Sequence, residues 1–238
     1  MHLLYCRLTL HDTLYFVTRE MGVLYETERY LHNYALAYAL FSNNLVNLPF
    51  FCDFYKPRYA EDLGQLNEAA VYVTPAQPLV WDYVLVTWKI GQAAYYRKSE
   101  QFGVGSKRNY PVNIGRAKEL APESVFEFYV LSEKPIALPR WIRLGKWMSK
   151  ALVEVREMES REREGAFAAA CALNPLDVPE GVLQVFDIVS MPPSSLAANA
   201  RLEGRYYEVG GPGRGIPLDM RFAIPELPQE VTARGRRK

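Results

Sequence analysis

Histidine and cysteine are scarce in this sequence and widely spaced. The 238 residues include three of each: His2, His11, His32, Cys6, Cys52 and Cys171. The histidines form no HxxxH pair and the cysteines no CxxC pair, the spacings that are typical of zinc sites. An odd number of separated cysteines does not build a disulfide framework either. We therefore expect reduced thiols, no bound metal and a cytoplasmic location.

Strong net charge and long apolar runs are also lacking. The formal net charge is +1, with 49% hydrophobic and 23% charged residues, as in ordinary soluble proteins. This balance excludes a uniformly basic nucleic-acid-binding protein but leaves room for local basic patches. No apolar run is long enough to span a bilayer. Arg7 interrupts the segment His2–Leu10, so we expect no signal peptide. Gly103–Lys107 lacks both the Walker and the GxGxxG spacing, and we expect no cofactor.

The stretch from Leu14 to Phe41 contains the clearest helix signal. Thr27 is a suitable N-cap, and apolar residues recur at helical spacing from Leu31 to Phe41. We expect a strand over Leu14–Val17, a loop, and a helix over Thr27–Phe41 that is buried on nearly all sides. A helix N-terminus favours anions such as phosphate, and the polar side chains near this one are candidate phosphate ligands: Arg19, Tyr25, Glu26, His32 and Asn33.

Most of the remaining chain has the alternating pattern of half-buried strands. The predicted strands are His2–His11, Val71–Thr74, Tyr83–Ile90, Val125–Leu131, Gly181–Val189, Arg205–Val209 and Leu218–Ile224. Ala151–Glu164 fits either a strand or a helix, and we favour a strand to about Arg156. Many strands with one good helix between the first two predict an α+β fold with a ferredoxin-like core in a single domain over residues 1–225. We expect the basic tail 226–238 to be disordered.

An insertion at about residues 91–122 is rich in cations and aromatic rings. Its cations are Arg97, Lys98, Lys107, Arg108, Arg116 and Lys118, and the rings include Tyr95, Tyr96, Phe102 and Tyr110. Cations meet phosphates and rings stack on bases, so this composition suits single-stranded nucleic acid. A solvated loop whose charges only maintain solubility is the alternative, and it stays open here.

Two shorter segments are further candidates. Arg140–Lys150 carries four cations and no acid, with Arg143, Lys146, Trp147 and Lys150 as the candidate RNA ligands and a surface strand with snorkelling side chains as the alternative. Gly210–Gly215, with Arg214, could approach a phosphate backbone, but a hairpin loop is the favoured interpretation. His32 could serve as a general base in metal-independent RNA cleavage or simply donate a hydrogen bond.

One long motif resembles a known family. Leu8–Leu40, together with Trp141–Lys150 and Leu173–Asp177, is similar to the Csc-one family, the Cas-five-like subunit of type I-D CRISPR effector complexes. The resemblance implies a non-catalytic, RRM-related protein that binds the 5′ handle of the CRISPR RNA. It implies two neighbours, a Cas-seven-like backbone subunit and a Cas-ten-like large subunit, near where the PAM duplex of the target double-stranded DNA enters; whether that DNA is itself a partner stays open. In a related subtype the Cas-five-like protein is itself the nuclease, so an endoribonuclease that processes repeat RNA is the alternative function.

The same resemblance implies roles for particular residues. The loop residues Arg19, Tyr25 and Glu26 and the helix start would bind the handle, and Arg143, Lys146 and Lys150 would line the same RNA path. A thumb-like β-hairpin would be formed either by Tyr95–Lys118 or by Asn44–Asn67. GGPGRG at Gly210–Gly215 does not reproduce the longer glycine signature of the processing nucleases, which argues against a cleaving role.

Overall fold

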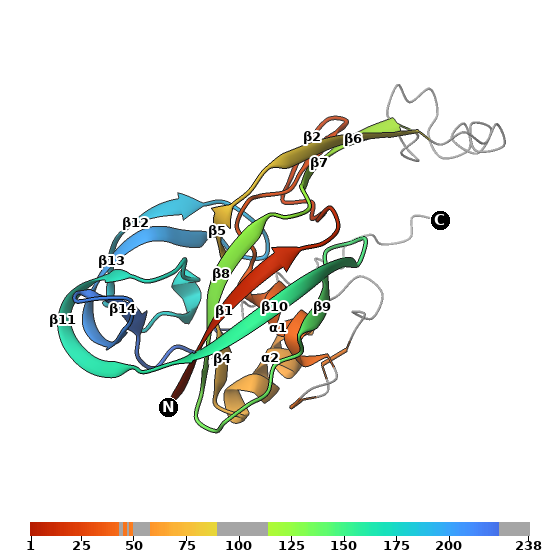
Figure 1. Ribbon diagram of the computed structural model, residues 1–238. Helices are drawn as coiled ribbons and strands as arrows, with labels where there is room; N and C mark the ends of the chain where they lie inside the picture. The colour runs from red at the N-terminus through yellow and green to blue at the C-terminus, as the bar shows by residue number, and fades with distance from the viewer. Residues whose placement is uncertain (43–44, 47, 50–57, 90–113, 224–238) are drawn as a thin grey trace, which may run out of the picture.

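The computed structural model describes residues 1–42, 45–46, 48–49, 58–89 and 114–223, and its centre is an antiparallel sheet (Figure 1). The strands of this sheet are β1 (His2–Leu10), β4 (Val71–Val73), β5 (Gln77–Val80), β8 (Val125–Ser132), β9 (Trp141–Leu144) and β10 (Ser149–Met158). They lie in the order β4-β8-β1-β10-β9, and β5 also pairs with β8. Within β1, Cys6 and Leu8 are buried while Arg7 is exposed. The alternation seen in the sequence is thereby confirmed.

Two helices lie against one face of the central sheet (Figure 1). They are α1 (Asn33–Phe41) and α2 (Tyr59–Glu68). Leu36 and Leu40 of α1 are fully buried and belong to one apolar core with Phe126 and Phe128 of β8. The sequence predicted only one helix here, because α2 follows a stretch rich in proline and aromatic residues.

The start of α1 differs from the prediction. The expected N-cap Thr27 does not begin a helix, because its hydroxyl accepts a hydrogen bond from the Phe16 amide (3.0 Å) and donates one to the Phe16 carbonyl (2.6 Å). Leu31 exchanges backbone hydrogen bonds with Ala76. Residues 27–31 therefore lie outside the helix, and His32 is the N-cap.

A smaller sheet, which we call the arm, projects from one end of the central sheet (Figure 1). It contains β2 (Arg19–Met21), β3 (Leu24–Glu26), β6 (Tyr83–Lys89) and β7 (Ile114–Leu120) in the order β2-β3-β7-β6. The predicted strand Leu14–Val17 is reduced to a single bridge between Leu14 and Leu120. The predicted loop that follows it is instead the hairpin β2–β3, which turns at Gly22 with φ +63.

A second sheet, antiparallel except for the parallel pairing of β11 with β14, lies beside the central one (Figure 1). Its strands are β11 (Arg161–Ala169), β12 (Leu183–Val189), β13 (Leu196–Glu208) and β14 (Arg214–Pro217). The 3₁₀ turn η1 (Pro175–Asp177) lies in the chain between β11 and β12. The ambiguous segment 151–164 is strand: β10 runs to Met158 and β11 begins at Arg161. The predicted edge strand Leu218–Ile224 is wrong, because the pairing with β13 falls earlier, at β14. The fold is mostly β, with curled sheets and few helices.

Within the described ranges, no helix is long and apolar enough to cross a membrane. Among the same residues, no group of three or more His, Cys, Asp or Glu side chains is placed to hold a metal ion. The thiols of Cys6 and Cys171 are both buried, and burial raises the pKa of each to about 12. The predicted tail and most of the predicted insertion lie outside the described residues.

Candidate nucleic-acid interface

The first feature of the candidate site is the histidine at the start of α1. The Nδ1 of His32 accepts a hydrogen bond from the Tyr34 amide (3.2 Å), and its Nε2 lies 3.0 Å from the Ser194 hydroxyl. Because Nδ1 is an acceptor, the ring proton resides on Nε2. The side chain is only 4% exposed, and burial lowers the pKa of His32 to about 4. His32 is therefore neutral at pH 7 with both ring nitrogens engaged, which suits a helix cap and not a general base.

Asn33 belongs to the protein interior and not to a surface. Its side chain is fully buried, and its amide donates to Asp177 Oδ2 at 2.7 Å. Tyr72 donates to the same oxygen at 2.9 Å, and the Ala223 amide donates to Oδ1 at 2.8 Å. Burial raises the pKa of Asp177 to about 7, although these hydrogen bonds act in the opposite direction. The expectation that Asn33 contacts RNA is thus corrected, because Asn33 ties α1 to η1 and to the last described residues.

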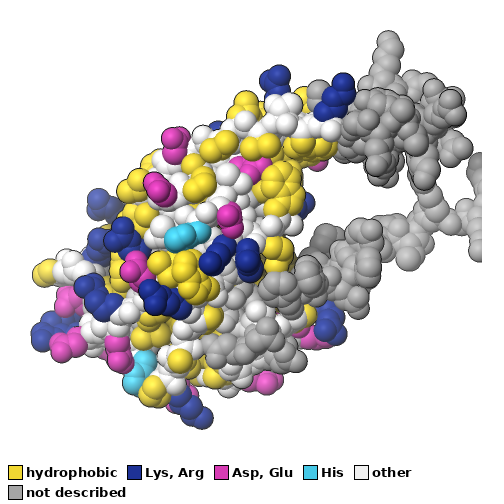
Figure 2. Space-filling model, turned by 45° about the vertical axis from the view of Figure 1, so that its right-hand side comes forward, with side chains coloured by type: hydrophobic (Ala, Val, Ile, Leu, Met, Phe, Trp, Pro, Cys, Tyr) yellow, Lys and Arg dark blue, Asp and Glu magenta, His cyan; other side chains and the backbone are white. Residues whose placement is uncertain are grey.

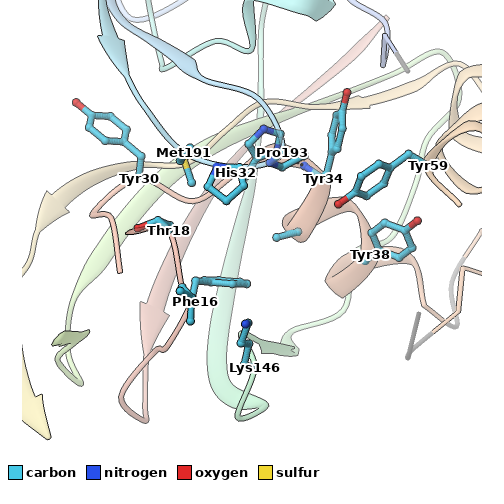
Figure 3. A pocket seen from close by; sticks show the side chains of 13 residues that line it. Phe16, Thr18, Tyr30, His32, Tyr34, Tyr38, Tyr59, Lys146, Met191 and Pro193 are labelled. Atoms are coloured by element: carbon cyan, nitrogen blue, oxygen red, sulfur yellow. Dashed lines mark hydrogen bonds between the residues drawn. The ribbon is translucent and has the colours of Figure 1, made fainter. Parts of the chain in front are cut away.

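An apolar pocket of about 280 Å³ lies beside this helix start (Figure 3). Residues from five parts of the chain line it: Phe16, Val17, Thr18, Tyr30, His32, Tyr34, Ala35, Tyr38, Tyr59, Lys146, Met191, Pro192 and Pro193. Figure 3 shows Phe16 and Lys146 on one side of the pocket and His32, Met191 and Pro193 on the opposite side. The sequence pointed to His32 and Lys146 but not to the aromatic walls or to Met191–Pro193.

The turn between β9 and β10 brings Lys146 to this pocket. Gly145 has φ +76, and a Cβ atom there would lie 2.8 Å from the Tyr15 carbonyl oxygen and 2.6 Å from Leu14. Only glycine fits so close an approach in the left-handed region. The Lys146 amide then donates to the Tyr15 carbonyl at 2.9 Å. This docking positions the exposed lysine side chain.

The same hairpin presents cations and aromatic rings to solvent. Arg143 is exposed and donates to the Met148 carbonyl at 3.0 Å. The Lys150 ammonium lies 4.0 Å from the centre of the Trp141 ring. Trp147 is exposed and packs against Tyr15 with ring centres 4.5 Å apart. Figure 2 shows Lys and Arg side chains gathered around hydrophobic ones beside a histidine on this side of the molecule. Cations beside rings are the pattern that single-stranded nucleic acids bind.

A second, charged pocket of about 240 Å³ adjoins the apolar one, because Thr18 lines both. Here Arg19 pairs with Glu28 at 3.1 Å and Lys118 pairs with Glu26 at 3.4 Å. These predicted RNA ligands therefore already have partners within the protein. The exposed Arg29, which the sequence analysis did not select, also lines this pocket, with its guanidinium 5.0 Å from the Trp81 ring.

The other predicted ligands lie elsewhere. Tyr25 stacks on Trp88 with ring centres 6.2 Å apart, and Arg116 is exposed on β7 of the arm. Arg214 is in the second sheet, where it donates to the Ala170 carbonyl at 2.9 Å and lies 3.9 Å from Glu127. It lines neither pocket. Five predicted ligands lie outside the described residues: Arg97, Lys98, Lys107, Arg108 and Tyr110.

Comparison with known protein families places the chain among the CRISPR-associated proteins of type I-D. A family model described as "Type I-D CRISPR-associated protein Cas5/Csc1" matches residues 1–225. The chain belongs to this Cas5/Csc1 family and is a CRISPR effector subunit. The resemblance seen in the sequence is thereby confirmed. No curated protein sequence matches the chain.

Two solved structures that match the chain are also CRISPR proteins. One is a chain in a cryo-EM structure of a Type III-B Cmr-beta complex bound to cognate target RNA and AMPPnP. It is 7% identical, the TM-score is 0.48, and the match covers 84% of this chain and 86% of that one. The other is a crystal structure of a CRISPR protein from Archaeoglobus fulgidus. It is 11% identical, the TM-score is 0.38, and the match covers 89% of this chain and 97% of that one.

Proposed function

We propose that this protein is a non-catalytic subunit that binds the 5′ handle of the CRISPR RNA in a cytoplasmic type I-D effector complex. The observation that carries the proposal is the β9–β10 hairpin, which presents Arg143, Lys146 and Lys150 beside an aromatic pocket in a chain of the Cas5/Csc1 family. Exposed cations neutralise phosphates, and nearby rings offer stacking surfaces to unpaired bases.

We further propose that the central sheet corresponds to a ferredoxin-like, RRM-related core. The strand order β10-β1-β8-β4 is antiparallel throughout. Both helices lie in sequence between β1 and β4, the first crossover of a split βαβ arrangement. The segment between β8 and β10 contains the strand β9 where that arrangement has its second helix.

The proposed neighbours are a Cas-seven-like backbone subunit and a Cas-ten-like large subunit, near the PAM end of the target DNA. The β6–β7 hairpin is the proposed thumb, because the arm to which it belongs projects from the central sheet (Figure 1). A short glycine–serine link in place of residues 90–113 should leave the full chain folded but reduce its recovery with the backbone subunit. Unchanged recovery would mean that another part of the chain makes this contact.

The main experiment reverses two charges on the β9–β10 hairpin. The double variant Arg143→Glu/Lys146→Glu should bind the handle RNA less tightly, and the guide should be lost from the purified complex. Lys134→Glu is the matched control, because Lys134 is exposed beyond β8, at the opposite end of the central sheet from the hairpin. The RNA probe is a synthetic copy of the 5′ segment sequenced from the complex.

The salt dependence of binding gives a quantitative readout. Arg29, Arg143, Lys146 and Lys150 are four cations near the pockets, and each neutralised phosphate of a single strand contributes about 0.7 to the slope of log K against log salt. We expect a slope of about −3 for the full-length chain and about −1.4 for the double variant. Equal slopes, or a guide retained in the double-variant complex, would remove the hairpin from the RNA path.

A further inference from the structure

The apolar pocket beside α1 has walls made mainly of ring faces and apolar side chains. Five of its lining residues are aromatic: Phe16, Tyr30, Tyr34, Tyr38 and Tyr59. Met191 and Pro193 lie on the side opposite Phe16 (Figure 3), and Pro192 also lines the pocket. Its volume of about 280 Å³ is just below the range of roughly 300 to 1,000 Å³ in which proteins hold drug-sized ligands. The space suits one ring system and is too small for two stacked nucleotides.

Several polar atoms that line this pocket are already engaged inside the protein. The Thr18 hydroxyl donates to the Glu26 carbonyl at 3.0 Å and accepts from the Glu28 amide at 2.9 Å. Both ring nitrogens of His32 have partners. The hydroxyls of Tyr34 and Tyr38 donate to the Ala223 carbonyl and to Asp62, respectively. A ligand in this pocket can therefore pack against these side chains but finds few of their hydrogen-bonding atoms free.

Lys146 supplies the charge at this pocket. Its side chain is exposed, and it lies beside Phe16 on the side that faces the β9–β10 turn (Figure 3). An apolar side chain from a neighbouring protein would gain nothing from an ammonium group there. A ring that carries a phosphate would gain from both the aromatic walls and the cation.

We propose that this pocket holds one unstacked base of the bound RNA by stacking, with Lys146 contacting the phosphate of that nucleotide. This inference rests on the proposed RNA-binding function and adds the mode of recognition. Because the hydrogen-bonding atoms of Thr18, His32, Tyr34 and Tyr38 are engaged, the pocket detects the presence of a base and not its identity. Stacking tolerates all four bases because each has a ring face.

The test combines an abasic scan of the handle RNA with a variant that fills the pocket. Loss of the base at one position should weaken binding to the full-length chain about 5- to 150-fold, the range for one stacked base. Exchange of that base for any other should change affinity by less than about threefold on the same reasoning. The variant Ala35→Phe fills the pocket with a ring of the protein's own. It should bind intact RNA as weakly as the wild type binds the abasic RNA, and the abasic site should then have no further effect.

Two controls separate pocket filling from damage to the fold. Ala35→Ser changes the same position with little added volume and should retain the wild-type response to the abasic site. Phe186→Ala removes a partly buried ring from β12, which lines neither pocket, and should do the same. Thermal unfolding of each variant should be cooperative. If Ala35→Phe fails to fold, Lys146→Met should reduce the salt slope by about 0.7 while leaving the abasic effect in place.

The outcomes distinguish this inference from the function on which it rests. If the chain binds the RNA but no abasic position weakens binding, the pocket does not hold a base. The same follows if the abasic effect persists in Ala35→Phe. Either result would leave the proposed function intact. No binding of handle RNA to the chain or its complex would overturn both. If Ala35→Phe binds RNA normally but loses a neighbouring subunit, the pocket holds a protein side chain and the inference is wrong.

Discussion

Two buried ionisable groups, His32 at the start of α1 and Asp177 in η1, should give opposite dependences of stability on pH. Burial raises the pKa of Asp177 from 3.8 to about 7, so its contribution to stability is complete below about pH 4 and is lost as pH rises to 7. Burial lowers the pKa of His32 from 6.5 to about 4, so its contribution is complete above pH 6.5 and is lost as pH falls to 4.

These shifts correspond to at most about 4 kcal/mol for Asp177 and about 3 kcal/mol for His32. Both side chains are only 4% exposed, so solvent screening does not reduce them greatly. Because the two contributions change in opposite directions over the same pH interval, they largely cancel in the wild type. Removing either group should expose the pH dependence of the other.

Urea unfolding of the full-length chain at several pH values between 4 and 7.5 measures this effect. The variant Asp177→Asn should lose up to about 3 kcal/mol as pH falls from 6.5 to 4. The variant His32→Asn keeps a good N-cap residue and should lose up to about 4 kcal/mol as pH rises from 4 to 7. The double variant lacks both groups, so its pH dependence of unfolding free energy comes from all other ionisable groups. Subtracting it from the profile of each other form isolates the contributions of His32 and Asp177. Single variants with the same profile as the wild type would refute the assignment of these pKa shifts to burial.

Three further predictions concern the fold and the absence of catalysis. Gly145→Ala should lower the free energy of unfolding more than Gly22→Ala. Both glycines have positive φ, but only at Gly145 would a Cβ atom meet backbone. Equal losses of unfolding free energy would mean that the turn shifts to make room for the methyl group. Thr27→Val should cost about 2 to 3 kcal/mol, because it leaves the part-buried amide and carbonyl of Phe16 without their partner. Thr87→Val, at an exposed position, should be nearly neutral, and a small effect at Thr27 would show that water replaces the hydroxyl. Repeat RNA incubated with the chain and EDTA should stay intact, and cleavage that is lost in His32→Ala would establish the nuclease alternative.

Four strands of the central sheet, β1, β4, β8 and β10, could be predicted from their apolar or alternating patterns, whereas β5 was missed and β9 was given only as an alternative. In β1 and in the first half of β10, more buried side chains alternate with less buried ones, and this period is visible in the sequence. β8 is instead buried at nearly every position, on both faces. The hairpin β2–β3 could not be recognised in this way, because each strand has only three residues and none is fully buried. α2 offered Glu61 and Asp62 in its first turn and buried Leu63 and Leu66, but the preceding aromatic stretch obscured these signals.

The candidate site was harder to predict because its parts come from distant segments. Thr27 satisfies the backbone of a neighbouring extended segment as well as it would a helix, and local sequence cannot distinguish these roles. The motif Leu173–Asp177 was noticed, but its link to Asn33 bridges 144 residues and appears only in the fold. Met191–Pro193 carry no chemical signal that would place them beside His32. Lys146 was predicted from its charge, yet the close approach of Gly145 that positions it was not.

The pairing of β1 also has a consequence for synthesis of the protein. Both neighbours of β1 come late in the chain: Leu3 pairs with Leu131 on one side and with Met158 on the other. At about 5 to 20 residues per second, the ribosome needs on the order of ten seconds to produce these partners after β1 has emerged. During that time Leu4, Leu8 and Leu10 have no sheet to enter, and an unpaired apolar strand is prone to aggregate. Slower elongation over the first 160 residues should therefore lower the soluble yield, and chaperones that hold nascent chains should restore it.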